Sequence, residues 1–393
     1  MAELIANPGR RPGEPLSRLV ADYVGAAAAE RVLALLHACP RYRPTPLLPL
    51  PSLARQLGIG ALMVKDEAQR LGLESFKSLG GIYAIAEILM QAAGVGPDAI
   101  MCDRVRALAA TRTFVCASDG NHGRSVAAGA RLFGARSIVF LHEGVSAARA
   151  GKIAALGAEI IRVPGTYDDS VDEAVRQAEI NGWTLVADTA ADTEDPIPGL
   201  IMRGYTTIAD EVLAGMKALG GPPSHLFVQA GVGGLAAAMT GHLRARLPGA
   251  GPIITVVEPV AADCLLQSAV QGRIAEVGGD VTTIYAMLEC RRPSPLAWEV
   301  LRGAADFFLS VDDDAAPAAM RALAWPQGDD PGIVAGESGA ASLAGLMTVL
   351  AWASWREQLG LNAASRVLVI NTEGATDPDL YARLVGRTAP QVA

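Results

Sequence analysis

Short apolar runs alternate with longer amphipathic stretches along most of this chain, and this alternation constrains the fold more than any other feature. Each run has the length of a short strand and few polar residues, as expected for strands that are buried on both faces. The runs are 62–64, 113–117, 137–141, 159–163, 225–229, 253–257 and 367–370. Helical patterns lie between them, at 80–93, 122–133, 147–156, 170–181 and 204–219. This repeated strand–helix order predicts an α/β fold with mostly parallel sheets wrapped by helices.

The strand-like runs fall into two clusters, which predict two open sheets. One cluster lies near 113–187 and the other near 225–372. The length of 393 residues also exceeds what one ordinary core accommodates, so we expect two domains. Ligands of such folds bind at the carboxyl ends of the strands, where loops enter helices, and those loops are therefore the candidate site.

Lys77 is the first candidate for a catalytic residue. Only four of the 33 Lys and Arg residues are lysines, so arginine serves wherever a positive charge alone suffices. Arginine stays protonated in proteins, whereas a lysine desolvated beside apolar groups can lose its proton and attack an aldehyde to form a Schiff base. Lys77 follows Phe76 and precedes Gly80 and Gly81, a context that predicts an amine with a covalent task on pyridoxal phosphate (PLP). The alternative is a solvated surface lysine or a simple contact to an anion.

A polar loop follows the predicted strand 113–117. It contains Ser118, Asp119, Gly120, Asn121 and His122, and an alanine-rich helix comes next. The first amides of a helix are unpaired donors, so this loop could bind a carboxylate or a cofactor oxygen. The Asn121 amide could donate to a phenolate, although an asparagine here could also stabilise only its own turn.

A second loop, rich in glycine, follows the strand 225–229 and has the form that cradles a phosphate with main-chain amides. A dinucleotide site is disfavoured, because Ala236 stands where the G-x-G-x-x-G pattern requires its last glycine. A third strand end carries Thr372, whose hydroxyl could bind a ring nitrogen or cap a helix.

Taken together and in this order, these segments resemble the fold-type-II PLP enzymes, which include threonine and serine dehydratases, cysteine synthase and tryptophan synthase β. Within that group the chain most resembles the diaminopropionate ammonia-lyases, over about residues 42–381. The matching segments are 75–77 with 79–81, 119–124, 167–169, 188–190, 197–198, 202 with 204–205, 229–233, 257–259 with 262–264, 336–340, and 372–374 with 376–377. The resemblance implies a large PLP-binding domain of residues 1–79 and 200–393, a small domain of residues 80–199, and a homodimer.

The resemblance also implies roles for single residues. Lys77 would hold PLP with Phe76 beside it, Asn121 would contact the ring hydroxyl and Thr372 the pyridine nitrogen. The remaining cofactor contacts would be Gly231, Val232, Gly233, Gly234, Leu235 and Glu337. The residues expected around the amino acid substrate are Ser118, Asp119, Gly120, His122 and Asp188.

Two aspartates favour a diamino acid as the substrate. Dehydratases of hydroxy amino acids usually carry Ser or Thr where this chain has Asp119, and Asp188 resembles a second acidic residue of the lyases. Diaminopropionate has an extra ammonium group, which carboxylates in a dry pocket would attract, and a carboxylate could also take the α-proton. We therefore expect Lys77, Asp119 and Asp188 to be catalytic in an α,β-elimination that yields pyruvate and ammonia. If the aspartates lie on opposite faces of the substrate, either enantiomer could react. The alternative is that Asp188 only caps a strand end and neither attracts the substrate nor takes a proton.

One segment departs from the lyases. They typically read Asp-Thr-Ala-Trp-Glu-Gly-Tyr, whereas residues 188–194 read Asp-Thr-Ala-Ala-Asp-Thr-Glu. This difference leaves open a serine or threonine dehydratase, or a β-replacing synthase, of the same fold. A protein that binds PLP without catalysis is disfavoured by the intact Lys77 and Asp119.

Composition excludes several other classes. The net charge is −8 and there is no basic stripe, so nucleic acid and anionic membranes are not expected partners. The first thirty residues lack the apolar core of a signal peptide, and the uncharged stretch 338–355 suits a buried helix better than a membrane span. The five cysteines are scattered without CxxC spacing, which argues against a disulfide framework or a zinc site, and no metal is expected. We expect a cytoplasmic protein with free thiols, although Cys264 and Cys290 both match cysteines of the lyases.

Overall fold

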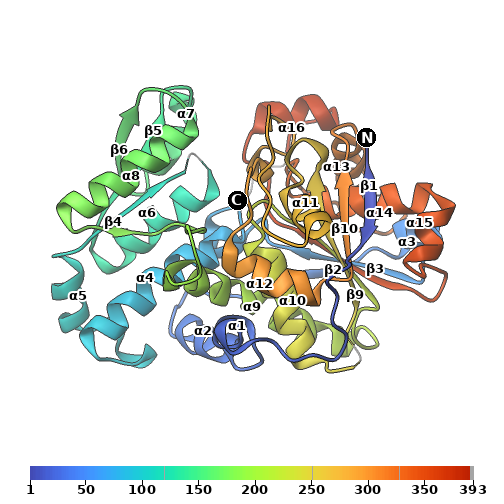
Figure 1. Ribbon diagram of the computed structural model, residues 1–393, viewed down its shortest axis with the longest axis horizontal. Coiled ribbons are helices and arrows are strands. Elements are labelled where there is room, and N and C mark those ends of the chain that lie inside the picture. Colours follow the sequence, from blue (N-terminus) through green and yellow to red (C-terminus); the bar gives the residue numbers. More distant parts are fainter. Residues whose placement is uncertain (119, 250, 327, 390–393) are drawn as a thin grey trace. The chain divides into compact units, whose positions relative to one another are not determined.

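The computed structural model describes residues 1–118, 120–249, 251–326 and 328–389, which form two compact units (Figure 1). The first unit comprises Met1–Ala28, Arg43–Phe76 and Ile208–Ala393, and the second comprises Ala29–Tyr42 and Lys77–Thr207. The domain bounds implied by the resemblance stay a prediction. In the structure, residues 29–42 belong to the second unit.

Among the described residues, the first unit has a seven-stranded sheet in the order β1-β10-β9-β8-β11-β3-β2. Its inner strands pair in parallel, whereas the edge strands β1 and β2 pair antiparallel with β10 and β3. The bounds are β1 Glu3–Ala6, β2 Leu47–Pro49, β3 Ala61–Asp66, β8 His225–Gln229, β9 Ile253–Pro259, β10 Phe307–Val311 and β11 Arg366–Asn371.

Helices cover both faces of this sheet. Every residue of β8 is buried, and because successive side chains of a strand point to opposite faces, Phe227 packs with the core around α14 while Leu226 and Val228 are buried on the other face. The helices are α1 Arg18–Val24, α3 Pro51–Leu57, α10 Gly234–Arg246, α11 Cys264–Gln271, α12 Pro295–Ala304, α13 Ala315–Ala324, α14 Ala341–Ala351, α15 Ala353–Gln358 and α16 Pro378–Val385. Short 3₁₀ turns occur at Arg70–Gly72, Val260–Ala262 and Ala286–Leu288.

The second unit has a four-stranded parallel sheet, within the described part of the chain, in the order β6-β5-β4-β7. Its strands are β4 Thr113–Ala117, β5 Arg136–His142, β6 Glu159–Val163 and β7 Thr184–Leu185. Its helices are α4 Lys77–Ala93, α5 Asp103–Ala109, α6 Asn121–Phe133, α7 Ala147–Ala154 and α8 Tyr167–Asn181, with most of α2 Ala28–His37, the first part of α9 Pro196–Ala218 and a 3₁₀ turn at Pro97–Ala99. Helices α4 and α6 pack closely, and a side chain at Gly81 would place its Cβ 2.5 Å from the Ser125 hydroxyl.

The predicted α/β class and the two mostly parallel sheets are confirmed, and each predicted strand is present. The sequence did not predict β1, β2, β7 and β10, of which the first three are edge strands of only two to four residues. The stretch 338–355 is also divided differently from the single buried helix that we expected. Helix α14 is largely buried, but the chain then turns at Trp352, which is 57% exposed, into the separate helix α15. Within the described residues, no helix combines the length and the apolar character that a membrane crossing requires.

Candidate active site

Three chemically suggestive segments emerge side by side from the sheet of the first unit. Strands β8, β11 and β3 are neighbours and run in parallel, so their carboxyl ends share one edge. The glycine loop follows β8, Thr372 follows β11, and the segment that leads to Lys77 follows β3. This is the edge at which α/β sheets bind ligands.

The residues just before Lys77 are bound to the end of β11. An antiparallel bridge joins Ser75 to Glu373, and the Phe76 N–H donates to the Thr372 carbonyl at 3.1 Å. Lys77, the next residue of the chain, begins α4. The backbone thus ties the predicted Schiff-base lysine to the residue predicted to contact the cofactor ring.

A buried ionic cluster anchors the start of the same segment. The Arg70 guanidinium donates to both Glu67 carboxylate oxygens at 2.7 Å and also to Glu211, while Lys65 Nζ donates to Glu211 at 2.5 Å and to the Thr45 carbonyl at 2.7 Å. Lys65 and Arg70 are 1% and 0% exposed, and removing one partner of such a pair costs about 3–5 kcal/mol. Lys65 therefore serves as a buried structural cation, so the scarcity of lysine does not by itself identify an amine with a covalent task.

Two residues with side chains take left-handed backbone conformations in this segment. Leu71 has a φ of 52° and Glu74 a φ of 58°, and each such conformation costs about 1–3 kcal/mol. The ionic cluster on one side and the bridge to β11 on the other hold the chain in this shape. These contacts therefore offset the cost of the strained backbone between Arg70 and Ser75.

Within the second unit, Lys77 and Asp188 form a close ion pair. Lys77 Nζ donates to Asp188 Oδ2 at 2.5 Å, and the two side chains are 21% and 24% exposed. Burial alone would raise the pKa of Asp188, but the positive charge and hydrogen bond of Lys77 outweigh it and hold that pKa well below its usual range. Two residues 111 positions apart in the chain are thus brought into contact, as a catalytic pair would require.

His122 holds the strand end that carries Asp188. Its Nε2–H donates to the Val186 carbonyl at 2.7 Å, which assigns this tautomer to the neutral ring. Burial lowers the pKa of His122, so the ring is neutral near pH 7. Its Nδ1 is buried and has no hydrogen-bond partner among the described residues. The geometry makes His122 a support for Asp188, while its predicted contact with substrate stays a prediction.

Asn121 and its loop lie at the end of β4. Asn121 is buried and is the first residue of α6, with Gly120 as the preceding cap. The Gly120 amide lies 3.4 Å from the Ser118 hydroxyl, a long contact that keeps the turn compact. Asp119, which the sequence predicts to be catalytic, lies outside the described residues.

The glycine loop after β8 is shaped for close approach of a ligand. Gly233 has a φ of 95°, which disfavours any residue with a side chain, and Gly234 begins α10. A Cβ at Gly231 would lie 2.8 Å from Cys290 Sγ. The Ser294 N–H donates to the Val232 carbonyl at 2.8 Å and fixes the middle of the loop. The predicted residue Leu235 is buried one position into α10.

Gln229 is a polar residue of this region to which the sequence reading assigned no role. It is the last residue of β8 and is 2% exposed. Its Nε2 donates to the Ser338 carbonyl at 2.8 Å and lies 3.1 Å from the Thr372 hydroxyl. Its Oε1 is buried and finds no partner in the part of the chain that the structure describes. The signal available in the sequence was a glutamine at the end of an apolar run, two residues before Gly231.

Glu337 occupies a tight turn that leads into α14. The residue is 2% exposed, and the Gly336 N–H donates to the Glu373 carbonyl at 3.1 Å. A Cβ at Gly336 would lie 2.6 Å from the Gly374 carbonyl oxygen, so the turn and the end of β11 touch backbone to backbone. Glu337 therefore lies beside Thr372's segment, and its predicted cofactor contact stays a prediction.

Glu258 supports the glycine loop indirectly, through the start of α11. It is the last residue but one of β9 and accepts hydrogen bonds from the Leu265 and Leu266 amides, both at 2.8 Å, at the start of α11. Cys264, the first residue of α11, places its Sγ 3.9 Å from the Gly231 carbonyl. Burial raises the pKa of Glu258 to about 8, and the two amide bonds offset this rise only in part.

This raised pKa predicts how stability depends on pH. Between pH 4.5, the ordinary pKa, and about 8, the folded protein keeps a proton on Glu258 that the unfolded chain has released. The free energy of unfolding therefore falls as pH rises, by up to about 1.4 kcal/mol per pH unit, and the loss is complete above pH 8. Glu258→Gln should gain stability relative to the parent between pH 6 and 8 in urea unfolding, and then level off. Parallel curves for both proteins would contradict this assignment, and the exposed Glu159→Gln is the control.

The residues present fit pyridoxal phosphate. The first unit offers a glycine loop in which Cys290 leaves no room for a Cβ at Gly231, a buried hydroxyl at Thr372, and a buried Gln229 oxygen without a described partner. The second unit offers an amine at Lys77 and an amide at Asn121. No cluster of His, Cys, Asp and Glu suited to a metal ion occurs among the residues described.

Comparison with known proteins gives consistent matches. The model of the family "Pyridoxal-phosphate dependent enzyme" matches residues 39–373. Diaminopropionate ammonia-lyase of Escherichia coli K12 is 41% identical over 88% of this chain and 87% of its own, and that of Salmonella typhimurium LT2 is 39% identical over 91% and 92%. A crystal structure of the E. coli enzyme in complex with an aminoacrylate-PLP azomethine reaction intermediate superposes with a TM-score of 0.88 and 37% identity, covering 98% of this chain and 97% of that one.

Proposed function

Because the chain belongs to the pyridoxal-phosphate dependent enzymes, and within them to the diaminopropionate ammonia-lyases, we propose that it removes ammonia from 2,3-diaminopropionate and releases pyruvate and ammonia. The observation that carries the proposal is the contact between Lys77 Nζ and Asp188 at 2.5 Å. A diamino acid brings a second ammonium group to the site, and a partly buried carboxylate attracts that charge, which serine and threonine lack.

The residues expected to hold the cofactor are those that the resemblance assigns to it. Lys77 supplies the amine, the loop amides of residues 231–235 bind the phosphate, Asn121 contacts the ring hydroxyl and Thr372 the ring nitrogen. When bound, pyridoxal phosphate supplies an electron sink for the pair of electrons left at the α-carbon. Everything else in the reaction is the task of the protein's own side chains.

Lys77 and Asp188 divide the proton chemistry. A base takes the α-proton, the bond from the β-carbon to its amino group breaks, and that nitrogen leaves as ammonia after gaining a proton. Lys77 Nζ can hold and deliver the proton that the leaving nitrogen needs. The released enamino acid then hydrolyses in water to pyruvate and a second ammonia.

The basicity of Asp188 depends on the charge at Lys77. With the ammonium of Lys77 close, the pKa of Asp188 is low and the carboxylate is a weak base. Burial acts in the opposite direction, so loss of the charge at Lys77 makes Asp188 a stronger base. Asp188 can therefore stay ionised while it attracts the substrate, and can accept the substrate's proton once the charge at Lys77 is lost.

A dehydratase or a β-replacing synthase of the same fold is the second candidate, because one segment near Asp188 departs from the lyases. Residues 191–195 form a largely exposed turn, in which the Glu194 N–H donates to the Asp192 carboxylate at 2.8 Å. The lyases typically carry aromatic residues here, so the space for the substrate side chain could differ.

A substrate screen tests the function. Purified protein supplied with pyridoxal phosphate should form pyruvate from D- or L-diaminopropionate at least about 100-fold faster, in kcat/KM, than pyruvate from serine or oxobutyrate from threonine. Ammonia and keto acid are measured together, since the lyase releases two ammonia molecules per pyruvate and a dehydratase only one. A higher rate with serine or threonine would move the assignment to the dehydratases.

The resemblance suggests how the protein assembles, and the scattered cysteines suggest its location. We propose a homodimer in the cytoplasm that binds an amino acid and neither nucleic acid nor membrane, supported by the net charge of −8 and the absence of a basic stripe in the sequence. Sedimentation of the purified protein at micromolar concentration should give twice the mass of 40.7 kDa, and a single species at 40.7 kDa would contradict the dimer.

A further inference from the structure

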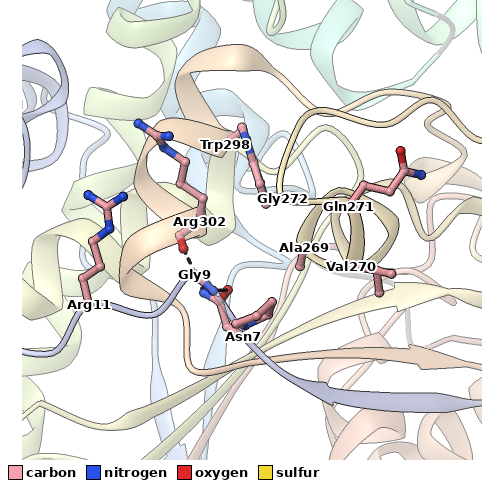
Figure 2. A pocket seen from close by; sticks show the side chains of 10 residues that line it. Asn7, Gly9, Arg11, Ala269, Val270, Gln271, Gly272, Trp298 and Arg302 are labelled. Carbon is pink, nitrogen blue, oxygen red and sulfur yellow. Dashed lines mark hydrogen bonds between the residues drawn. The ribbon is translucent and has the colours of Figure 1, made fainter.

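A cavity lies within the first unit, formed by segments to which the proposed reaction assigns no role. Figure 2 shows its lining, which comes from residues 7–9 and Arg11 after β1, from the end of α11 with Gly272, and from α12. The cavity measures about 330 Å³, which is within the range of small-molecule sites. Nothing in the proposed elimination explains this cavity.

The lining is positively charged. Arg11 and Arg302 both line the cavity, and the described lining contains no Asp or Glu. Arg302 pairs with Glu299 at 2.7 Å and Arg11 approaches Glu14 at 3.5 Å, but all four side chains are at least 26% exposed, and exposed pairs of this kind contribute little. A ligand carboxylate can therefore compete with Glu299 and Glu14 for these guanidinium groups, which bind carboxylates in a bidentate manner. This positive lining contrasts with the net charge of −8 of the whole chain.

Helix ends near the cavity do not cancel this charge. The carboxyl end of a helix carries about half a negative charge, which would oppose an anion. At α12, however, the Asn7 side-chain amide donates to the Leu301 carbonyl at 3.2 Å and to the Ala305 carbonyl at 2.7 Å, and the Arg11 N–H donates to the Gly303 carbonyl at 2.9 Å. These carbonyls at the end of α12 are thus already paired with donors, which weakens their repulsion of an anion.

The rest of the wall is apolar and suits a carbon skeleton. Trp298, Ala269 and Pro8 line the cavity, and Val270 is 58% exposed at its edge. The side-chain amide of Gln271 adds one neutral hydrogen-bonding group. The combination of two guanidinium groups and an aromatic wall is complementary to a small carboxylate with an apolar body.

Both helices that line the cavity also touch the glycine loop at their other ends. The residue before α12, Ser294, donates its N–H to the Val232 carbonyl, and Cys264 at the start of α11 approaches Gly231. A Cβ at Gly233 would lie 3.2 Å from Leu265 of α11. Helix α12 is ten residues, or about 15 Å, long, so a short rigid element joins the cavity to the loop.

We propose that this cavity is an effector site for a small carboxylate with an apolar body, and that its occupancy changes how tightly the glycine loop holds a phosphate. A ligand shifts the loop only if it binds the two loop arrangements with different affinity, and the coupling is then reciprocal. The site is independent of which amino acid the enzyme consumes.

Binding is tested by calorimetry on the holoenzyme with sodium benzoate. We expect benzoate to bind, and expect the double variant Arg11→Gln/Arg302→Gln to weaken that binding at least tenfold. The control is Arg176→Gln, which breaks a similar exposed pair with Glu173 on α8 and should leave affinity within twofold. Benzamide, the uncharged analogue, and inorganic phosphate, which lacks an apolar body, should each bind at least tenfold more weakly than benzoate. No binding of benzoate, or equal binding by the double variant, would overturn the site, and equal affinity for benzamide or phosphate would overturn its chemistry.

Coupling is tested by equilibrium dialysis of pyridoxal phosphate with and without saturating benzoate. We expect the dissociation constant of the cofactor to change about fivefold or more in the parent protein and to stay unchanged in the double variant. A change that persists in the double variant would place the effect of benzoate elsewhere, and no change in the parent would reject the effector role. Neither measurement needs turnover, so a failed lyase assignment and a failed effector site give different results.

Discussion

Lys77→Ala is expected to lower the rate of pyruvate formation from 2,3-diaminopropionate by about 10⁴-fold or more. The alanine variant has neither the amine that would hold the cofactor nor the proton donor for the leaving nitrogen. The fold should persist, because the segment before Lys77 is fixed by backbone hydrogen bonds to β11 and by the buried ionic cluster. Steady-state pyruvate release at saturating substrate and cofactor measures the effect.

Two further variants show whether the reaction needs the free amine of Lys77 or only its positive charge. Lys77→Arg keeps a cation beside Asp188 but cannot supply a free amine, so it should lose as much activity as Lys77→Ala while unfolding at a temperature closer to that of the parent. Lys152→Ala changes an exposed lysine of α7 and should remain active. Both Lys77 variants should lack the visible absorption band that borohydride bleaches, and the Lys152 variant should keep it. A Lys77→Ala protein that forms pyruvate at the parent rate would refute the role of Lys77.

Asp188→Asn is expected to lower kcat/KM by about 10²–10⁴-fold for one enantiomer of diaminopropionate and much less for the other. The asparagine is nearly the same size, but it cannot accept the α-proton and does not attract the substrate's second ammonium. Asp119→Asn is the complementary variant and should impair the other enantiomer more. Assays with separate D- and L-substrates decide the matter, and equal losses on both isomers from either variant would contradict a division of labour between the two aspartates.

A stability measurement shows whether the loss of activity in Asp188→Asn reflects lost chemistry or a destabilised fold. The pKa of Asp188 is held well below its usual range, so its favourable interaction with Lys77 is fully present above about pH 4 and is lost only as the pH falls further. Asp188→Asn should therefore lower the melting temperature by a similar amount at every pH from 6 to 9. Glu159→Gln breaks the exposed pair with Arg136 and should cost about 0–1 kcal/mol. A stability loss in Asp188→Asn that grows steeply between pH 6 and 9 would indicate that another group titrates there.

The fold class and the site loops could be read from the sequence because their signals are local. A strand buried on both faces shows as a short apolar run, and β8 is such a strand, with every residue buried. The glycine loop could be predicted because the positive φ of Gly233 requires that residue type. Short edge strands such as β1 carry no comparable signal, since their pairing depends on a neighbour about 300 residues away.

Residue type and order along the chain determined that the amine of Lys77, the polar loop with Asn121 and the glycine loop would follow strands. They could do so because backbone conformation and side-chain chemistry are local properties. Only the tertiary structure decided that Asp188 would contact Lys77, that Lys65 would be a buried structural cation, and that Arg11 and Arg302 would line one cavity. The physical reason is that these arrangements depend on distances between side chains far apart in the chain, which are set when the helices and strands pack and bury their apolar faces.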